Sequence, residues 1–116
     1  MKFTAIVVIA PDDLEDRVIE RAQQAGAAGV TILTGKGIGG EAKKTFFGLT
    51  FEGTQSVLLM VVGAHLAATI LKELHRVLVG GTESRGLAFA VPIEHLTGID
   101  MRQVVKFEEH LRQDDA

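Results

Sequence analysis

The stretch that decides the fold is TILTGKGIGGEAKKTFFGLTFEGTQSVLLMVV, residues 31–62. It begins as a β-rich run, breaks into glycines and lysines, and resumes as the very apolar segment VLLMVV at residues 57–62. Short runs of β-branched and apolar residues bounded by glycine are typical of strands. The connection between these two strands, residues 35–56, is long for a compact domain, and long connections often carry a function.

The glycine-lysine segment GKGIGGEAKKT, residues 35–45, is a near miss for a P-loop. The P-loop pattern G-x-x-x-x-G-K-[ST] needs a glycine directly before the lysine, whereas the pair Lys43–Lys44 follows Ala42 and no helical pattern comes after it. Glycine amides together with Lys36 and the lysine pair still suit an anion. A solvated, flexible arm with incidental lysines is the alternative, and composition leaves it open.

Length and composition indicate one globular domain over residues 1–116, with a formal net charge of −3. This charge gives no general attraction to nucleic acid or to an anionic membrane, so we expect neither as a direct partner. The chain has no cysteine, which excludes disulfides and thiolate metal sites and favours a reducing cytoplasm. No apolar run approaches the roughly 20 residues needed to span a bilayer.

The remaining pattern predicts a strand and a helix before this stretch, and a helix, a strand and a last helix after it. Residues 2–9 and 87–91 are strand-like, and residues 64–79 have apolar residues at helical spacing. Asp12 and Glu15 are spaced as a capping box before a helix that Gly26 ends. A last helix is expected over residues 101–112, with Asp100 as its N-cap.

The order β-α-β-β-α-β with an extra C-terminal helix predicts an α+β, ferredoxin-like domain with an antiparallel sheet and both helices on one face. The strands at residues 6–9 and 57–62 are apolar on both sides, so a solvated second face would be costly. We therefore expect the chain to self-associate through packed sheets.

These elements and the long loop resemble the PII signal-transduction family and its PII-like relatives, over nearly the whole chain up to about residue 96. The resemblance rests on GAAGVTIL leading into KGIG, on LLMVV before the second helix, and on GLAFAVPIE, which is similar to a family strand ending F-x-x-P-x-E. It implies a homotrimer with a T-loop at about residues 35–56 and a B-loop at about residues 80–86. It further implies an adenine nucleotide bound between subunits as effector, and a target protein contacted through the T-loop.

By position, the resemblance implies a set of nucleotide-binding residues from the second strand, the root of the T-loop and the B-loop. They are Gly29, Thr31, Lys36, Gly37, Gly39, Gly40, Gly81, Arg85 and Gly86. Backbone amides and an arginine fork both suit phosphate oxygens. The alternative for the B-loop glycines is that they only form a turn.

The chain also departs from the family pattern. Leu87 stands where a phosphate-binding lysine is expected, Gly98 and Asp100 stand in place of two arginines, and Leu59 replaces an adenine-side glutamate. The T-loop has no tyrosine, which removes the uridylylation switch of some relatives. Triphosphate binding in the usual mode is therefore in doubt, while a diphosphate, monophosphate or cyclic nucleotide, or no nucleotide, stays open.

No pattern indicates a metal site or an enzyme. Among the four histidines, His65 and His75 are ten positions apart on one expected helix, about 15 Å along its axis, so they cannot share an ion. Neither Ser56 nor Ser84 has a nucleophile motif around it, and the pair Asp12–Asp13 is explained by helix capping and solubility.

The sequence therefore predicts a cytoplasmic PII-like regulator without catalytic activity, which meets a membrane only through a protein partner. The alternative is a trimeric interaction module of the CutA type, responsive to metal or not, which binds no nucleotide. A small ferredoxin-like enzyme with a cleft between chains is a weaker option. The role of Phe46 and Phe47, on the T-loop, stays open: they either form a contact surface or extend a hairpin.

Overall fold

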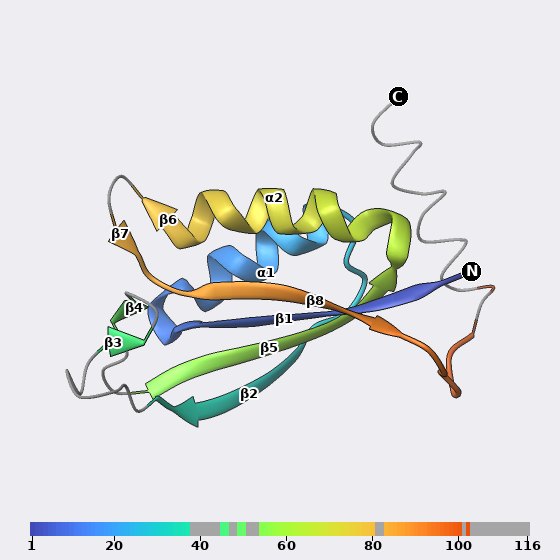
Figure 1. The fold of residues 1–116 in the computed structure, drawn as a ribbon, viewed down its shortest axis with the longest axis horizontal. Coiled ribbons are helices and arrows are strands. Elements are labelled where there is room, and N and C mark those ends of the chain that lie inside the picture. Colours follow the sequence, from blue (N-terminus) through green and yellow to red (C-terminus); the bar gives the residue numbers. More distant parts are fainter. Residues whose placement is uncertain (38–44, 47–48, 51–53, 81–82, 101, 103–116) are drawn as a thin grey trace.

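A computed structural model describes residues 1–37, 45–46, 49–50, 54–80, 83–100 and 102. Four strands form one sheet: β1 (Phe3–Pro11), β2 (Thr31–Lys36), β5 (Thr54–Gly63) and β8 (Leu87–Ile93). Their spatial order is β2-β5-β1-β8, and every neighbouring pair is antiparallel. Helices α1 (Glu15–Gln24) and α2 (Ala67–Leu78) lie on the same face of this sheet (Figure 1). This architecture confirms the predicted ferredoxin-like βαββαβ fold.

Short elements complete the described part of the chain. The 3₁₀ turns η1 (Asp12–Leu14) and η2 (Ala64–Leu66) precede the two helices. Two small hairpins pair β3 (Thr45–Phe46) with β4 (Leu49–Thr50) and β6 (Val79–Gly80) with β7 (Glu83–Ser84). The first hairpin falls within the predicted T-loop and the second within the predicted B-loop.

Element ends differ from the predicted ones. Strand β5 begins at Thr54 rather than at residue 57, because its pairing with β2 continues to the base of the loop. Strand β8 continues through Pro92 to Ile93, beyond the predicted end at residue 91. Proline is tolerated there because β8 is an edge strand, where a missing N–H need not break a ladder. Helix α2 ends at Leu78, since the next two residues pair in a hairpin.

The predicted capping box at the start of α1 is wrong. No side-chain hydrogen bond caps either η1 or α1, and the Glu15 amide donates to the Asp12 carbonyl in the 3₁₀ turn. The Glu15 carboxylate accepts a 2.8 Å hydrogen bond from the Ser56 hydroxyl instead. This contact joins the start of α1 to the strand that leaves the long loop.

The predicted C-terminal helix lies almost entirely outside the described residues. At its start, the Arg102 amide donates to the Asp100 carboxylate over 2.9 Å, and Arg102 is helical. An Asp side chain that accepts from an amide two positions later is the N-cap arrangement expected for Asp100.

The core lies between the helices and one face of the sheet. Alternate residues of β1 and β5 are fully or almost fully buried against apolar residues of both helices: Ile6, Val8, Ala10, Leu58, Met60, Val62, Val18, Ala22, Ile70 and Leu74. Each fully buried aliphatic side chain stabilises the fold by roughly 1.5–3 kcal/mol relative to an exposed one. One face of the sheet therefore accounts for the stability of the single chain.

The other face of the sheet is apolar and has no helix over it among the described residues (Figure 1). Val7 lies opposite Leu59 on one side and Phe89 on the other, and Ala5 lies between Val61 and Val91 in the same way. Leu33, Leu59, Val61, Phe89 and Val91 are 37–49% exposed. These five residues are called the open-face cluster below, and they confirm that the strands are apolar on both sides.

Two connections between elements require glycine, one after α1 and one before β8. Gly26 has φ +122°, and its amide and that of Ala27 donate to the carbonyls of Gln23 and Ala22, which is a Schellman C-cap. Gly86 lies so close to β1 that a Cβ there would be 2.7 Å from the Ile9 carbonyl oxygen. Both positions need glycine, one for its backbone conformation and one for space.

Replacing Gly26 by alanine should destabilise the fold by about 1–3 kcal/mol, the usual cost of a side chain in a positive-φ conformation. The added Cβ would also lie 2.9 Å from Leu66 Cδ1. Gly29→Ala is the control, because a Cβ there meets nothing within 4 Å and φ is not positive. Urea unfolding of both variants checks this, and equal midpoints would contradict it.

Gly86→Ala should cost about 1–3 kcal/mol of stability through overpacking, because Ile9, Ala10 and Leu78 all lie within 3 Å of the new methyl. Gly80→Ala, in the same hairpin region, meets nothing within 4 Å and should change stability by less than about 0.5 kcal/mol. Thermal unfolding followed by circular dichroism compares the two. A Gly86 variant as stable as the Gly80 variant would show that β1 does not constrain this position.

Candidate functional site

The root of the long loop is formed by the ends of β2 and β5. Lys36 pairs with Thr54 and Gly35 with Gln55, so the two ends of the loop lie side by side. Lys36 is exposed at the end of β2, and Gly37 follows it. Gln55 is buried, and its Nε2 has no hydrogen-bond partner within the described residues. The root therefore presents an exposed cation and a buried amide nitrogen that no described residue satisfies.

The structure places the other candidates of this region along the same edge of the sheet. Thr31 is the first residue of β2, pairs with Leu59, and is exposed to solvent. Gly29 lies just before β2 and is exposed, with open space around its Cα. Gly39 and Gly40 lie outside the described residues. The described candidates thus follow the β2 edge rather than converging on one point.

The B-loop candidates lie at the opposite edge of the sheet, just before β8. The Arg85 amide donates to the Leu78 carbonyl over 2.8 Å, which closes the β6–β7 hairpin against α2. The Ser84 hydroxyl donates to the Gly86 carbonyl over 3.3 Å. Gly86 is buried against β1, and Gly81 lies outside the described residues. The backbone around Arg85 is therefore held on both sides.

The Arg85 guanidinium already has a partner within the chain. Its Nη2 lies 2.9 Å from both carboxylate oxygens of Asp13, a residue of η1. Asp13 was predicted to serve helix capping and solubility, and the capping part is wrong, because no side chain caps η1 or α1. Sequence reasoning missed this pair since its members are 72 positions apart. It missed the Ser56–Glu15 hydrogen bond for the same reason.

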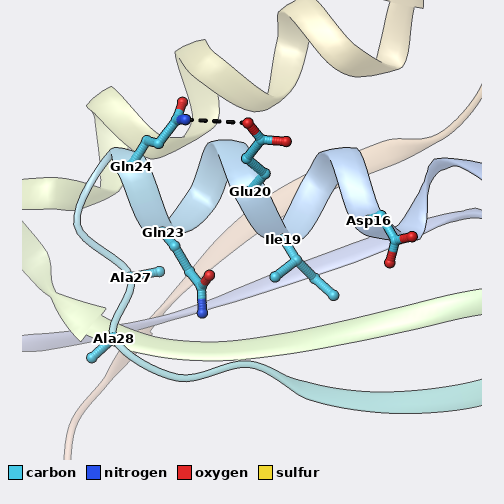
Figure 2. A pocket seen from close by; sticks show the side chains of 7 residues that line it. All are labelled: Asp16, Ile19, Glu20, Gln23, Gln24, Ala27 and Ala28. Carbon is cyan, nitrogen blue, oxygen red and sulfur yellow. Dashed lines mark hydrogen bonds between the residues drawn. The ribbon is translucent and has the colours of Figure 1, made fainter.

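A cavity beside α1 does not include any of the candidates. It has a volume of about 570 Å³ and is lined by α1 and the connection after it: Asp16, Ile19, Glu20, Gln23, Gln24, Ala27 and Ala28. Figure 2 shows these side chains on α1 and, for Ala27 and Ala28, on the connection that follows it, with Gln24 donating to Glu20 over 3.4 Å. Two carboxylates in its wall disfavour a phosphate by charge repulsion. We therefore do not assign the nucleotide to this cavity.

The histidines give no metal centre in the described part of the chain. No group of three or more His, Cys, Asp or Glu side chains there is arranged to hold an ion. His65, His75 and His95 are exposed, and His110 lies outside the described residues. Among the helices that the structure describes, none combines the length and the apolar character that a bilayer crossing requires.

Comparisons with known proteins agree with this geometry. The family model of nitrogen regulatory protein P-II matches residues 3–103. A search of curated proteins returns no match. Among solved structures, GlnK of B. subtilis in complex with ATP is 15% identical, with a TM-score of 0.62, over 80% of this chain and 84% of that one.

Two further structures share the fold. CPII of Thiomonas intermedia K12, bound to ADP, AMP and acetate, is 15% identical, with a TM-score of 0.61, over 79% of this chain and 86% of that one. The periplasmic divalent cation tolerance protein CutA of Archaeoglobus fulgidus is 19% identical, with a TM-score of 0.65, over 94% of this chain and 98% of that one. The structural likeness shows the fold, and the match to the family model over most of the chain decides the family. The chain belongs to the nitrogen regulatory protein P-II family.

Proposed function

We propose that the chain is a PII-like regulatory protein of the cytoplasm that works as a homotrimer and not as an enzyme. It binds a small effector, with an adenine nucleotide as the best candidate, in clefts between its subunits. Binding is sensed at the root of the loop at residues 35–56, which then contacts or releases a target protein. This is a conformational switch driven by ligand contacts at one end of a segment.

The observation that carries this proposal is the separation of the two halves of the site. Lys36 and Thr31 lie at the β2 edge, whereas Arg85 and Gly86 lie before β8 at the other edge, with β5 and β1 between them. Three interstrand steps of about 4.8 Å separate the two edges by roughly 14 Å. One phosphate group cannot reach both edges of the same sheet. The halves meet only where the β2 edge of one copy adjoins the β8 edge of another.

The open-face cluster supports the association of copies. Soluble chains seldom leave so many neighbouring apolar side chains in water, and exposed patches of this kind mark interfaces. Packing the open faces of three copies around an axis would bury them together and bring sheet edges of different copies into contact. The same packing would therefore complete the site.

The choice of an adenine nucleotide rests on relatives and on the charges present. GlnK of B. subtilis was solved with ATP, and CPII of Thiomonas intermedia with ADP and AMP. In this chain Leu87 is half-buried at the expected lysine position, and Gly98 has φ +93°, a conformation that an arginine would rarely adopt. With fewer cations than the family pattern, the site suits a diphosphate, monophosphate or cyclic nucleotide better than a triphosphate.

A CutA-like interaction module without nucleotide binding is the second candidate. The CutA structure of Archaeoglobus fulgidus matches 94% of this chain, a larger share than the GlnK structure does. The pairing of Arg85 with Asp13 also fits it, because the arginine is then part of the scaffold rather than of a ligand site. In this reading the loop recognises a partner protein directly.

Val61→Asp should convert the trimer largely to single chains, because three carboxylates would be buried together without partners, each at a cost of several kcal/mol. Val61 is 44% exposed in the single chain, so the variant should still fold. Ala68→Asp adds the same charge at an exposed position of α2, on the helix side, and should leave the mass unchanged. Size-exclusion chromatography with light scattering measures both. A Val61→Asp protein with the same mass as the parent would contradict the proposed interface.

Isothermal titration calorimetry with ATP, ADP, AMP and cyclic AMP tests the nucleotide proposal. We expect at least one to bind below millimolar concentration, and Arg85→Ala to weaken it roughly tenfold or more, since a hydrogen bond to a charged group contributes about 1.5–3 kcal/mol. Arg21→Ala is the matched control, because Arg21 pairs with Glu73 on the helical layer. The absence of binding by all four nucleotides would leave the CutA-like reading in place.

A further inference from the structure

The Asp13–Arg85 pair places a carboxylate where a ligand phosphate would bind. A single guanidinium nitrogen, Nη2, lies between both oxygens of Asp13, at 2.9 Å from each. Carboxylate and phosphate oxygens use the same donors of arginine. While Asp13 holds this position, the positive charge of Arg85 is compensated within the chain.

Both partners are held in place by the fold around them. Arg85 follows a hairpin that is tied to α2 through the Leu78 carbonyl, and Gly86 is packed against β1. Asp13 belongs to the 3₁₀ turn that continues β1. The pair thus links the B-loop to the end of the central strand across a long sequence separation.

The pair is nevertheless open to exchange. The side chains of Arg85 and Asp13 are 44% and 58% exposed, so water and salt weaken their attraction. Asp12, in the same 3₁₀ turn, adds a further negative charge beside Asp13. An anion can therefore displace Asp13 from Arg85. The released Asp13 carboxylate and its acidic neighbour then repel that anion.

We propose that Asp13 is an intramolecular competitor for the anionic group of the ligand and selects ligands with few negative charges. A phosphate must displace Asp13 to reach Arg85, and each additional phosphate is repelled by the carboxylate that it has displaced. Leu87 stands where the family pattern has a lysine, so one cation that would offset this repulsion is missing. This inference rests on the proposed function, because it names the ligand class of the same site.

The test compares the parent protein with Asp13→Asn, which keeps the shape of the side chain and removes its charge. AMP, ADP and ATP are titrated by calorimetry at low and high salt. Affinity for AMP should rise roughly threefold to tenfold, the effect of one exposed charge, and affinity for ATP should rise by a larger factor. High salt should reduce both gains. Asp16→Asn removes an exposed charge from the start of α1, at a residue that forms no ion pair with Arg85 among the described residues, and should change affinity less than about twofold.

The outcomes separate this inference from the proposed function. Equal nucleotide affinities in the parent and in Asp13→Asn would overturn the inference and leave nucleotide binding intact. An equal gain for AMP and ATP would overturn the selection by charge. If no variant binds any nucleotide, the proposed function fails, and pyrophosphate then tests the competition alone. Stronger pyrophosphate binding by Asp13→Asn than by the parent, lost when Arg85→Ala is added, supports the competition, whereas equal binding by Asp13→Asn and the parent overturns it.

Discussion

The one-sided cover of the central sheet is the constraint on which the rest of the structure depends. Two helices return to the same face because both β-α-β crossovers have the same hand, and together they bury alternate residues of β1 and β5. Nothing else in the described chain covers the opposite face, although its side chains are just as apolar. The single chain therefore has a packed core on one face of the sheet and exposed apolar side chains on the other.

The strand order of the same sheet explains why the candidate site is divided into two halves. The strand order puts β2 and β8 at opposite edges, so the loop root and the B-loop are separated by the two central strands of their own sheet. Each half is held firmly by local contacts. The Ser56–Glu15 hydrogen bond joins β5 to α1, and Gly86 fixes the B-loop on β1. In the proposed trimer, the assembly that covers the apolar face is the same one that joins the two halves.

Much of the fold could be predicted from the sequence, because the spacing of apolar residues and the positions of glycines indicate where strands and helices begin and end. The apolar run at residues 57–62 and the stop at Gly26 both lie where the structure has β5 and the end of α1. The element ends were less predictable, since pairing partners extend β5 to Thr54 and carry β8 past Pro92.

The site was harder to predict than the fold, for a physical reason. Asp12 and Glu15 have the spacing of a capping box. In the structure, however, the Glu15 carboxylate accepts a hydrogen bond from the distant Ser56 hydroxyl, and the Glu15 amide donates to the Asp12 carbonyl in a 3₁₀ turn. Asp13 and Arg85 meet only after the whole βαββαβ chain has folded. A spacing rule cannot detect a contact between segments that the topology alone brings together. Gly86 shows the same limit, because its need for glycine arises from the closeness of β1.

Native mass spectrometry of the unmodified protein at micromolar concentration tests the central claim most directly. The account predicts a dominant species at three times the 12.4 kDa mass of one chain, because only association covers the open face and completes the site. A dominant species at the mass of a single chain would contradict it, since the two halves of the site would then remain at opposite edges of one sheet.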